Sequence, residues 1–238
     1  MRGTICGYTG NIIQPVDEAD NIQPQKNPPN FLVISLQHLH LCRTNVRYMP
    51  VKKIDKQELL HRCWEVFNRH GYHGTSVSML AEATGLGKSG LMHHHLSKES
   101  LMLAVMEYAQ ETLRTMVFSV VREDLPPEQK LEKLLRRQNR LVKIERQGCF
   151  FANTALETGR EGNFNEPIQQ IWEEWKKAVA SILKAIMSPE EAANTAYRLL
   201  LEYEGAIIMY KISNETQHLE QFVARAVALF GKKMQKKS

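Results

Sequence analysis

The sequence is poor in cysteine, and its few cysteines follow no pattern that builds a disulfide framework or a zinc ribbon. Four occur in 238 residues, Cys6, Cys42, Cys63 and Cys149, without a CxxC pair or a regular spacing. Scattered free thiols fit a reducing compartment, so we expect the protein to be cytoplasmic.

Long hydrophobic runs are also missing. The run FLVISLQHLHL, from Phe31 to Leu41, is too short to span a bilayer. It lies behind Pro28 and Pro29, too far from the N-terminus for a signal peptide. We therefore expect no membrane partner.

Motifs for enzyme chemistry are absent as well. The sequence has no Ser, His and acid motif, no phosphate-cradling glycine loop and no metal-ligand spacing. Three adjacent histidines, His93, His94 and His95, are the one group that invites a metal interpretation. On a helix they would point about 100° apart and could not close on one ion. We expect no metal, no cofactor and no enzyme activity.

The composition that remains is that of a globular protein with a slight basic excess. Apolar residues make up 43% and the formal net charge is +5, which fits an anionic partner without identifying one. Residues 1–48 are rich in Asn, Gln and Pro and lack a helical period. Met49 opens MPVKKIDKQELL, which resembles a natural protein start. We expect residues 1–48 to be a disordered extension that the working protein does not need.

From Asp55 onward, helix signals follow one another with almost no strand signature, so the predicted fold class is all-α. A first helix starts at Asp55, which has capping-box spacing to Glu58, and ends at Gly71. Residues 75–85 and 88–94 predict two short helices, the first capped by Thr75 or Ser76, that meet at a tight glycine turn. Short helices in this arrangement indicate a helix-turn-helix over residues 54–100.

Longer helical periods occupy residues 101–232. Ser97 caps the first of them, and Pro127 suits the first turn of another. Ser188, Pro189 and Glu191 form a capping box; Asn214 and Gln217 have the same spacing, ahead of a helix expected to stop at Gly231. The basic stretch 233–238 reads as a solvated end.

One segment carries a family resemblance. GYHGTSVSMLAEATGLGKSGLMHHHLSKESLMLAV, which begins at Gly71, resembles the DNA-binding region of TetR-family regulators, GYxxTSVxxIAxxAGVSKGSLYxHFxSKExL. The match runs without a gap from Leu59 to Met106. It implies a three-helix DNA-binding domain followed by a larger helical domain that binds a ligand and forms a dimer.

The resemblance also implies which residues face DNA. A short exposed helix enters the major groove, where Lys88 is the candidate base reader, while Lys98 holds a phosphate. Leu80, Ala81, Leu86 and Leu91 are expected to be core. The candidate DNA contacts are Ser76, Ser78, Lys88, Ser89, Gly90, Met92, His93, His94 and Lys98.

Three positions depart from the family pattern. Met92 replaces a Tyr, Gly87 replaces a Ser or Thr helix cap, and His95 replaces a Phe. Each departure weakens DNA binding in expectation. Two functions stay open: a ligand-responsive repressor, and a ligand-binding or interaction module with weakened DNA binding.

The resemblance further predicts a homodimer on a palindromic operator, released by a small-molecule inducer. The last two helices are the expected dimer interface, through Tyr197, Leu201, Ile208, Phe222, Ala226 and Leu229. The central helices are the expected pocket, lined by Phe118, Cys149, Phe150, Phe151, Asn153, Glu157, Trp172, Trp175 and Tyr203. Cys149 has two interpretations, a small buried hydrophobe or a reactive thiol at a helix start.

Overall fold

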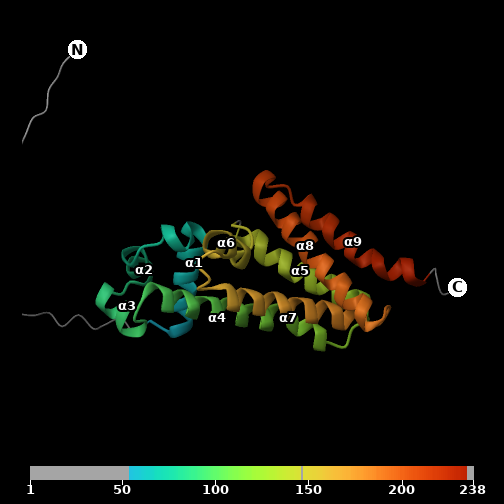
Figure 1. Ribbon diagram of the computed structural model, residues 1–238, viewed down its shortest axis with the longest axis horizontal. Coiled ribbons are helices and arrows are strands. Elements are labelled where there is room, and N and C mark those ends of the chain that lie inside the picture. Colours follow the sequence, from blue (N-terminus) through green and yellow to red (C-terminus); the bar gives the residue numbers. More distant parts are fainter. Residues whose placement is uncertain (1–53, 146, 235–238) are drawn as a thin grey trace, which may run out of the picture. The chain divides into compact units, whose positions relative to one another are not determined.

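The computed structural model describes residues 54–145 and 147–234, and within these ranges the chain is helical without a strand (Figure 1). The predicted all-α fold class is therefore confirmed. The helices are α1 (Lys56–Gly74), α2 (Val77–Thr84), α3 (Lys88–His94), α4 (Lys98–Met116), a 3-10 turn η1 (Phe118–Arg122), α5 (Pro127–Glu145), α6 (Phe150–Thr158), α7 (Asn165–Leu183), α8 (Pro189–Ser213) and α9 (Gln217–Met234).

The expected caps begin α1, α2 and α4 and end α2, whereas α1 continues past the predicted stop at Gly71 to Gly74. The Asp55 carboxylate accepts from the N–H groups of Gln57 and Glu58, and Ser76 Oγ accepts from Met79 N. Gly85 ends α2 in the left-handed conformation, at φ 70°. Ser97 begins α4 with a capping box. The α2–α3 pair is thus the helix-turn-helix that the sequence predicts.

Two details of the last helices differ from the sequence prediction. Asn214 lies in the left-handed conformation (φ 59°) and closes the C-terminus of α8 instead of starting α9. Asn can take either role, and here the turn to α9 needs the positive φ. Gly231 does not end α9, which continues to Met234. The capping box of Ser188 and Glu191 is confirmed.

Two apolar cores lie in the described chain. One fills the helix-turn-helix and continues into α6 and α7, through Phe150, Phe151, Phe164, Ile168 and Ile171. The other joins α5, α7, α8 and α9. Because α6 and α7 contribute to the first core, α1 and α4 pack directly on the larger helical body.

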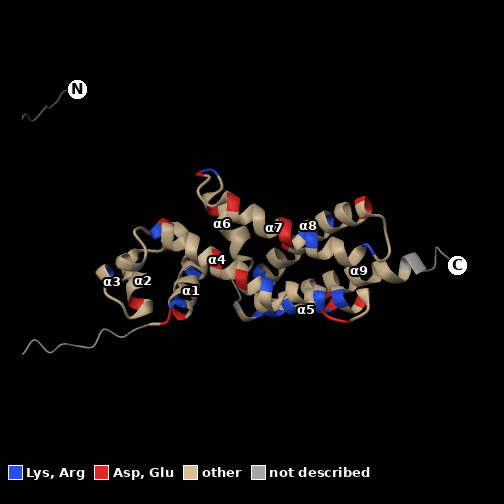
Figure 2. Ribbon diagram, turned by 90° about the horizontal axis from the view of Figure 1, so that it is seen from below, with Lys and Arg blue, Asp and Glu red and all other residues tan. Residues whose placement is uncertain are grey.

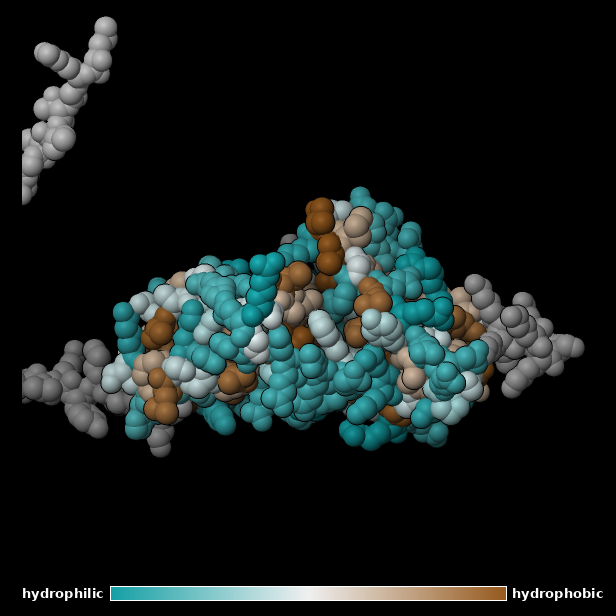
Figure 3. Space-filling model, in the orientation of Figure 1, coloured by the Kyte–Doolittle hydropathy of each residue, from teal (hydrophilic) through white to brown (hydrophobic). Residues whose placement is uncertain are grey.

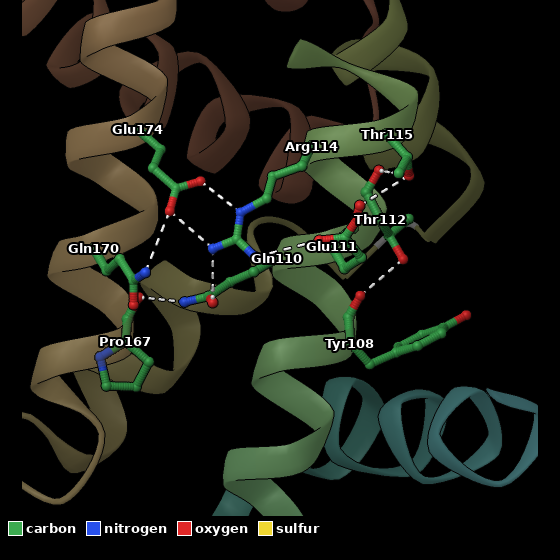
Figure 4. A network of polar contacts seen from close by, with 9 residues as sticks. All are labelled: Tyr108, Gln110, Glu111, Thr112, Arg114, Thr115, Pro167, Gln170 and Glu174. Carbon is green, nitrogen blue, oxygen red and sulfur yellow. Dashed lines mark hydrogen bonds and ion pairs between the residues drawn. The ribbon is translucent and has the colours of Figure 1, made fainter. Parts of the chain in front are cut away.

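Polar contacts also join α4 to the body (Figure 4). The Arg114 guanidinium donates to both carboxylate oxygens of Glu174 on α7, at 2.7 and 2.8 Å. Beside it, Gln110 Nε2 donates to the carbonyl of Pro167 at 2.8 Å. The hydrogen bond from Arg114 lowers the pKa of Glu174. These bonds fix the middle of α4 against α7.

Basic residues of α5 alternate with acidic partners along one side of the body (Figure 2). Lys133 and Arg137 both pair with Glu123, and Arg136 and Lys143 both pair with Glu220. The charge of α5 is thus largely used within the fold. None of the described helices is both long and apolar enough to cross a membrane.

Candidate DNA-reading head and ligand cavity

The predicted DNA-contacting face is exposed at one end of the described chain, where Figure 1 shows α2 and α3. Leu91 is fully buried and anchors α3 to the head, as Leu80 and Ala81 anchor α2. Met92 is half-buried against the same core. The candidates with exposed side chains or surfaces are Ser76, Ser78, Lys88, Ser89, Gly90 and His93. His94 lies on α3, but its side chain is outside the described set.

The departures from the family pattern have visible local effects. Gly87 occupies the N-cap of α3 in an extended conformation, and no side chain bonds the first amides of that helix. His95 is half-buried and ends α3 as its C-cap. The described residues include no group of three His, Cys, Asp or Glu side chains that could hold a metal ion.

The ammonium of Lys98 is turned inward, toward the end of α1. Its ammonium donates to the carbonyls of Tyr72 at 2.9 Å and Thr75 at 3.1 Å, and it lies 4.2 Å from the centre of the Tyr72 ring. These carbonyls lie at the end of α1, so Lys98 ties the start of α4 to the entry of α2. The ammonium takes these internal partners because the end of α1 offers acceptors within reach, and the phosphate contact of Lys98 stays a prediction.

Behind the head, a cavity of about 270 Å³ lies where five helices meet. Cys149, Phe150 and Phe151, three of the predicted pocket residues, line it at the start of α6. α1 and α4 supply most of the other side chains, together with α5 and α8. The remaining lining residues are His61, Trp64, Asn68, Tyr108, Ala109, Thr112, Leu113, Met116, Gln138, Leu141, Val142, Gly148 and Ile207.

Four predicted pocket residues do not line this cavity: Phe118, Trp172, Trp175 and Tyr203. Trp175 and Tyr203 stack at 6.3 Å between ring centres, and both are buried in the core of the body. Trp175 reaches the wall indirectly, since its Nε1 donates to Gln138 Oε1 at 2.6 Å. Of the four, Trp175 thus supports the cavity wall from behind, through Gln138.

Asn153 and Glu157 also lie away from the cavity, beside a separate surface depression. Asn153 Nδ2 donates to the carbonyl of Gln147 at 2.8 Å. The Glu157 carboxylate accepts from the backbone N–H groups of Tyr72 and His73. Both side chains are engaged in holding the chain rather than turned to a ligand.

The thiol of Cys149 lies in an environment that opposes the thiolate. Burial raises its pKa well above the ordinary value, and the nearby Glu204 carboxyl raises it further. Cys149 caps α6, where its sulfur accepts from Ala152 N at 3.4 Å. Burial also raises the pKa of Glu204 to about 7. This geometry favours the interpretation of Cys149 as a cavity-wall residue over a reactive thiol.

With the head and the cavity placed, comparison with known proteins identifies the family. The N-terminal family of bacterial regulatory proteins, tetR family, matches residues 56–105. The C-terminal domain of LmrA/YxaF-like transcriptional regulators matches residues 128–225. The chain belongs to the TetR family of transcriptional regulators.

Individual relatives are distant but span most of the chain. The HTH-type transcriptional repressor DhaR of Mycobacterium sp. (strain GP1) is 24% identical over 179 residues, which cover 71% of this chain and 88% of DhaR. An HTH-type regulator encoded in the lacX 3' region of Lactococcus lactis subsp. lactis is 21% identical and covers 69% of this chain and 87% of its own. The crystal structure of a TetR-family regulator from Streptomyces coelicolor superposes with a TM-score of 0.67 at 15% identity, over 74% of this chain and 94% of that one. The structural likeness shows a shared fold.

Sequence reasoning missed the contribution of α1 to the cavity of this TetR-family chain. His61, Trp64 and Asn68 all line it, and their spacing puts them on one face of α1. That periodicity was a usable signal, but it is also what a core-facing helix shows. Only the packing of α4 and α6 against α1, with α5 across the cavity, distinguishes the two.

The predicted dimer residues divide into an exposed set and a buried set. Tyr197, Leu201 and Ile208 on α8 are about half exposed, at 51%, 56% and 49%. Met209 and Ile212 continue this apolar ridge, and hydrophobic side chains protrude where α8 passes into α9 (Figure 3). Phe222 and Ala226 are fully buried within the chain, and Leu229 is half-buried. The α8 ridge is thus the part of the predicted interface that is free to meet a partner, whereas Phe222 and Ala226 are core.

Proposed function

We propose that the protein is a ligand-responsive repressor that binds a palindromic operator as a homodimer and is released by a small-molecule inducer. The observation that carries the proposal is the position of the cavity, which α1 of the DNA-reading head shares with the helical body. A molecule in this cavity contacts the head itself, so it can favour one setting of the head over another. The similar protein DhaR is a transcriptional repressor, which supports repression as the direction of regulation. Such a regulator acts on DNA, so we expect it in the cytoplasm.

The dimer proposal rests on the α8 ridge. An exposed apolar stripe along one long helix is typical of a surface that pairs with its own copy across a twofold axis. One head reads only a short stretch of DNA, whereas two heads about 34 Å apart read a palindrome. The ridge lies on the part of the body away from α3 (Figure 1), which leaves both heads free for DNA.

The walls of the cavity favour an uncharged and largely apolar inducer. Aromatic and aliphatic side chains such as Trp64, Phe150 and Leu141 make up most of the lining. No Asp, Glu, Lys or Arg appears among the described residues that line it. His61, Asn68, Thr112 and Gln138 supply the few polar groups. An ion would lose its hydration here without gaining a counter-charge.

A direct test is binding of the full chain to the DNA upstream of its own gene, measured by fluorescence anisotropy over a range of salt concentrations. We expect salt-sensitive binding to a palindromic fragment, with random DNA bound about a thousand-fold more weakly. Lys88→Ala should lose part of the preference for the fragment, because Lys88 is exposed on α3 and can donate to guanine. Equal affinity for the fragment and random DNA would contradict a regulator.

A second candidate function is a ligand-binding or interaction module with weakened DNA binding. The uncapped N-terminus of α3 at Gly87 favours it, because a frayed recognition helix binds DNA poorly. The same titration separates the two functions. Weak binding to DNA of any sequence, by a protein that still forms a stable dimer and binds a small molecule in the cavity, would support the module.

A further inference from the structure

The most unusual feature of the head is a break in α1 that a residue of the body caps. At Gly71 the backbone takes φ 73° and ψ 173°, which interrupts the helix, and one more turn follows to Gly74. A helix that restarts exposes its first N–H groups, which a residue at the N-cap normally satisfies through its side chain. Gly71 has no side chain to do so.

Glu157, which lies 85 residues away in sequence from Tyr72, supplies the missing cap. Its Oε2 accepts from Tyr72 N at 2.8 Å and its Oε1 accepts from His73 N at 2.6 Å. A carboxylate that receives two backbone N–H groups makes a strong, directional contact. A side chain at position 71 would collide with it, since an added Cβ would lie 2.6 Å from Glu157 Oε2. The absence of a side chain at Gly71 therefore makes room for Glu157.

The segment that Glu157 holds leads directly into the recognition unit. The carbonyls of Tyr72 and Thr75 accept from the Lys98 ammonium at the start of α4. Thr75 immediately precedes Ser76, the N-cap of α2. A shift of the 71–75 segment therefore displaces the entry of α2 and the start of α4 together.

The other end of α6 is part of the cavity wall. Phe150, the first residue of α6, lines the cavity and meets Trp64 of α1 edge-to-face, at 6.4 Å between ring centres. Glu157 lies in the last turn of the same helix, which is nine residues long and so spans about 13 Å. Such a short helix moves as one body, with the cavity at one end and the α1 break at the other.

We propose that Glu157 is a positioning residue that couples occupancy of the cavity to the setting of the helix-turn-helix, through the amides of Tyr72 and His73. This inference rests on the proposed function and deepens it. A molecule that pushes Phe150 away from Trp64 shifts α6, and Glu157 passes the shift to the break in α1. The α6 helix then joins the cavity to the head through two discrete contacts, in addition to packing. One is Phe150 against Trp64, and the other is Glu157 on the amides of Tyr72 and His73.

The test uses the full chain, the upstream DNA and N-phenyl-1-naphthylamine, a neutral aromatic fluorophore that brightens in apolar sites. The measured quantity is the ratio of the DNA Kd with saturating fluorophore to the Kd without it. For the wild type we expect a ratio of about ten. For Glu157→Gln, which puts an amide N–H group against a backbone N–H group, we expect about two or less, while the fluorophore Kd stays close to that of the wild type.

Glu161→Gln is the matched control. Glu161 lies four residues further on and pairs with the His73 ring at 2.8 Å, not with the α1 backbone. This variant should keep the wild-type ratio. Gly71→Ala attacks the same contact from the α1 side, because its Cβ needs the space that Glu157 fills. It should lower the ratio as Glu157→Gln does. A merely structural role for Glu157 would change stability but not this ratio.

Hydrogen exchange of the peptide that contains Tyr72 and His73 gives an independent readout. Without fluorophore, the two amides should exchange about ten-fold faster in Glu157→Gln than in the wild type. If the wild type binds the fluorophore and weakens on DNA while Glu157→Gln responds equally, the inference is overturned and the proposed function stands. If the wild type binds neither DNA nor fluorophore, or its DNA affinity ignores the bound fluorophore, the proposed function fails and the inference with it.

Discussion

The DNA-reading head and the helical body are stabilised by different kinds of contact. In the head, α2 and α3 have only eight and seven residues. They depend on the Ser76 cap of α2, a glycine turn and a few buried side chains such as Leu80 and Leu91. In the body, helices of 18 to 25 residues such as α8 and α9 share an extensive apolar core. Ion pairs such as Arg114–Glu174 then bind the C-terminal half of α4 to this body (Figure 4).

This difference means that the head responds to small local changes, whereas the body responds to loss of packing. A side-chain cap contributes about 1 kcal/mol to a short helix, and in the head α2 has such a cap at Ser76 whereas α3 has none. The same change on the surface of α8 would have little effect on folding. The proposed function uses this contrast, because in it the head shifts while the body keeps the proposed dimer together.

The largest effect should come from the buried part of the predicted dimer interface. Phe222 is fully buried against Tyr203, at 5.0 Å between ring centres. Phe222→Glu places an unpaired charge in this core and should reduce the free energy of unfolding by more than about 4 kcal/mol. Urea titration followed by circular dichroism measures the loss.

Leu201→Glu is the contrasting variant, because Leu201 is 56% exposed on α8. It should keep the native helix content but convert the proposed dimer to a monomer, as sedimentation would show. If Phe222→Glu is as stable as the wild type, Phe222 does not belong to the core, and the contrast between core and interface fails. A Leu201→Glu dimer of unchanged affinity would remove the ridge from the interface.

Glu204 provides a pH-dependent test of the body. Its pKa of about 7 in the folded protein exceeds the ordinary value of 4.5, because burial disfavours the charged form. The folded state therefore binds the proton more tightly, and the free energy of unfolding falls as the pH rises from about 4.5 to about 7. Glu204→Gln removes this fall.

The variant should gain about 2–3 kcal/mol over the wild type at pH 8, but about 1 kcal/mol or less at pH 5. Any cost of burying the amide is the same at both pH values, so the difference between them isolates the titration. Urea titrations at the two pH values measure it. Parallel pH profiles for both proteins would show that the Glu204 carboxyl is hydrated.

Two lysines of the head sharpen the comparison within one region. Lys98 binds the carbonyls of Tyr72 and Thr75, so Lys98→Ala should destabilise the protein by about 1–2 kcal/mol. Lys88 is exposed on α3, so Lys88→Ala should leave stability within about 0.5 kcal/mol and instead relax preference at one base pair per half-site, by about 1–3 kcal/mol. Thermal unfolding and anisotropy on operator variants give both quantities. If Lys98→Ala keeps full stability and only flattens the salt dependence, Lys98 contacts phosphate after all.

The same contrast explains what could be read from the sequence. Caps such as Asp55, Ser76 and Ser188 act on residues two or three positions away, so their spacing alone places the helix ends. Spacing alone did not predict the role of Asn214. An Asn can end one helix or begin the next, and the backbone geometry of the turn determines which of the two it does.

Pocket lining depends on contacts between helices that are distant in sequence, and aromatic content cannot predict it. Trp175 and Phe150 look alike as candidates, yet Trp175 stacks on Tyr203 in the core and Phe150 faces the cavity. The same holds for Glu157 and Lys98, polar residues expected to face a ligand and DNA. Their partners are backbone groups at the break in α1, and no local sequence pattern predicts these contacts.

The smallest expected effect tests how far the head departs from its family. Gly87 has an extended backbone, φ −68° and ψ 159°, which is the usual N-cap conformation, and nothing lies within 4 Å of an added Cβ. Gly87→Ser therefore fits without strain, and its hydroxyl can accept from the free N–H of Ser89 or Gly90. The gain should be a few tenths of a kcal/mol in stability, which corresponds to about a two-fold tighter DNA Kd if α3 must be helical to bind.

Gly87→Ala is the control, because it adds a Cβ without an acceptor and should weaken binding. Anisotropy on the upstream fragment distinguishes the three proteins. If Ser and Ala leave the DNA Kd equally unchanged, the helicity of α3 does not limit binding, and the module with weakened DNA recognition becomes the better account of this chain.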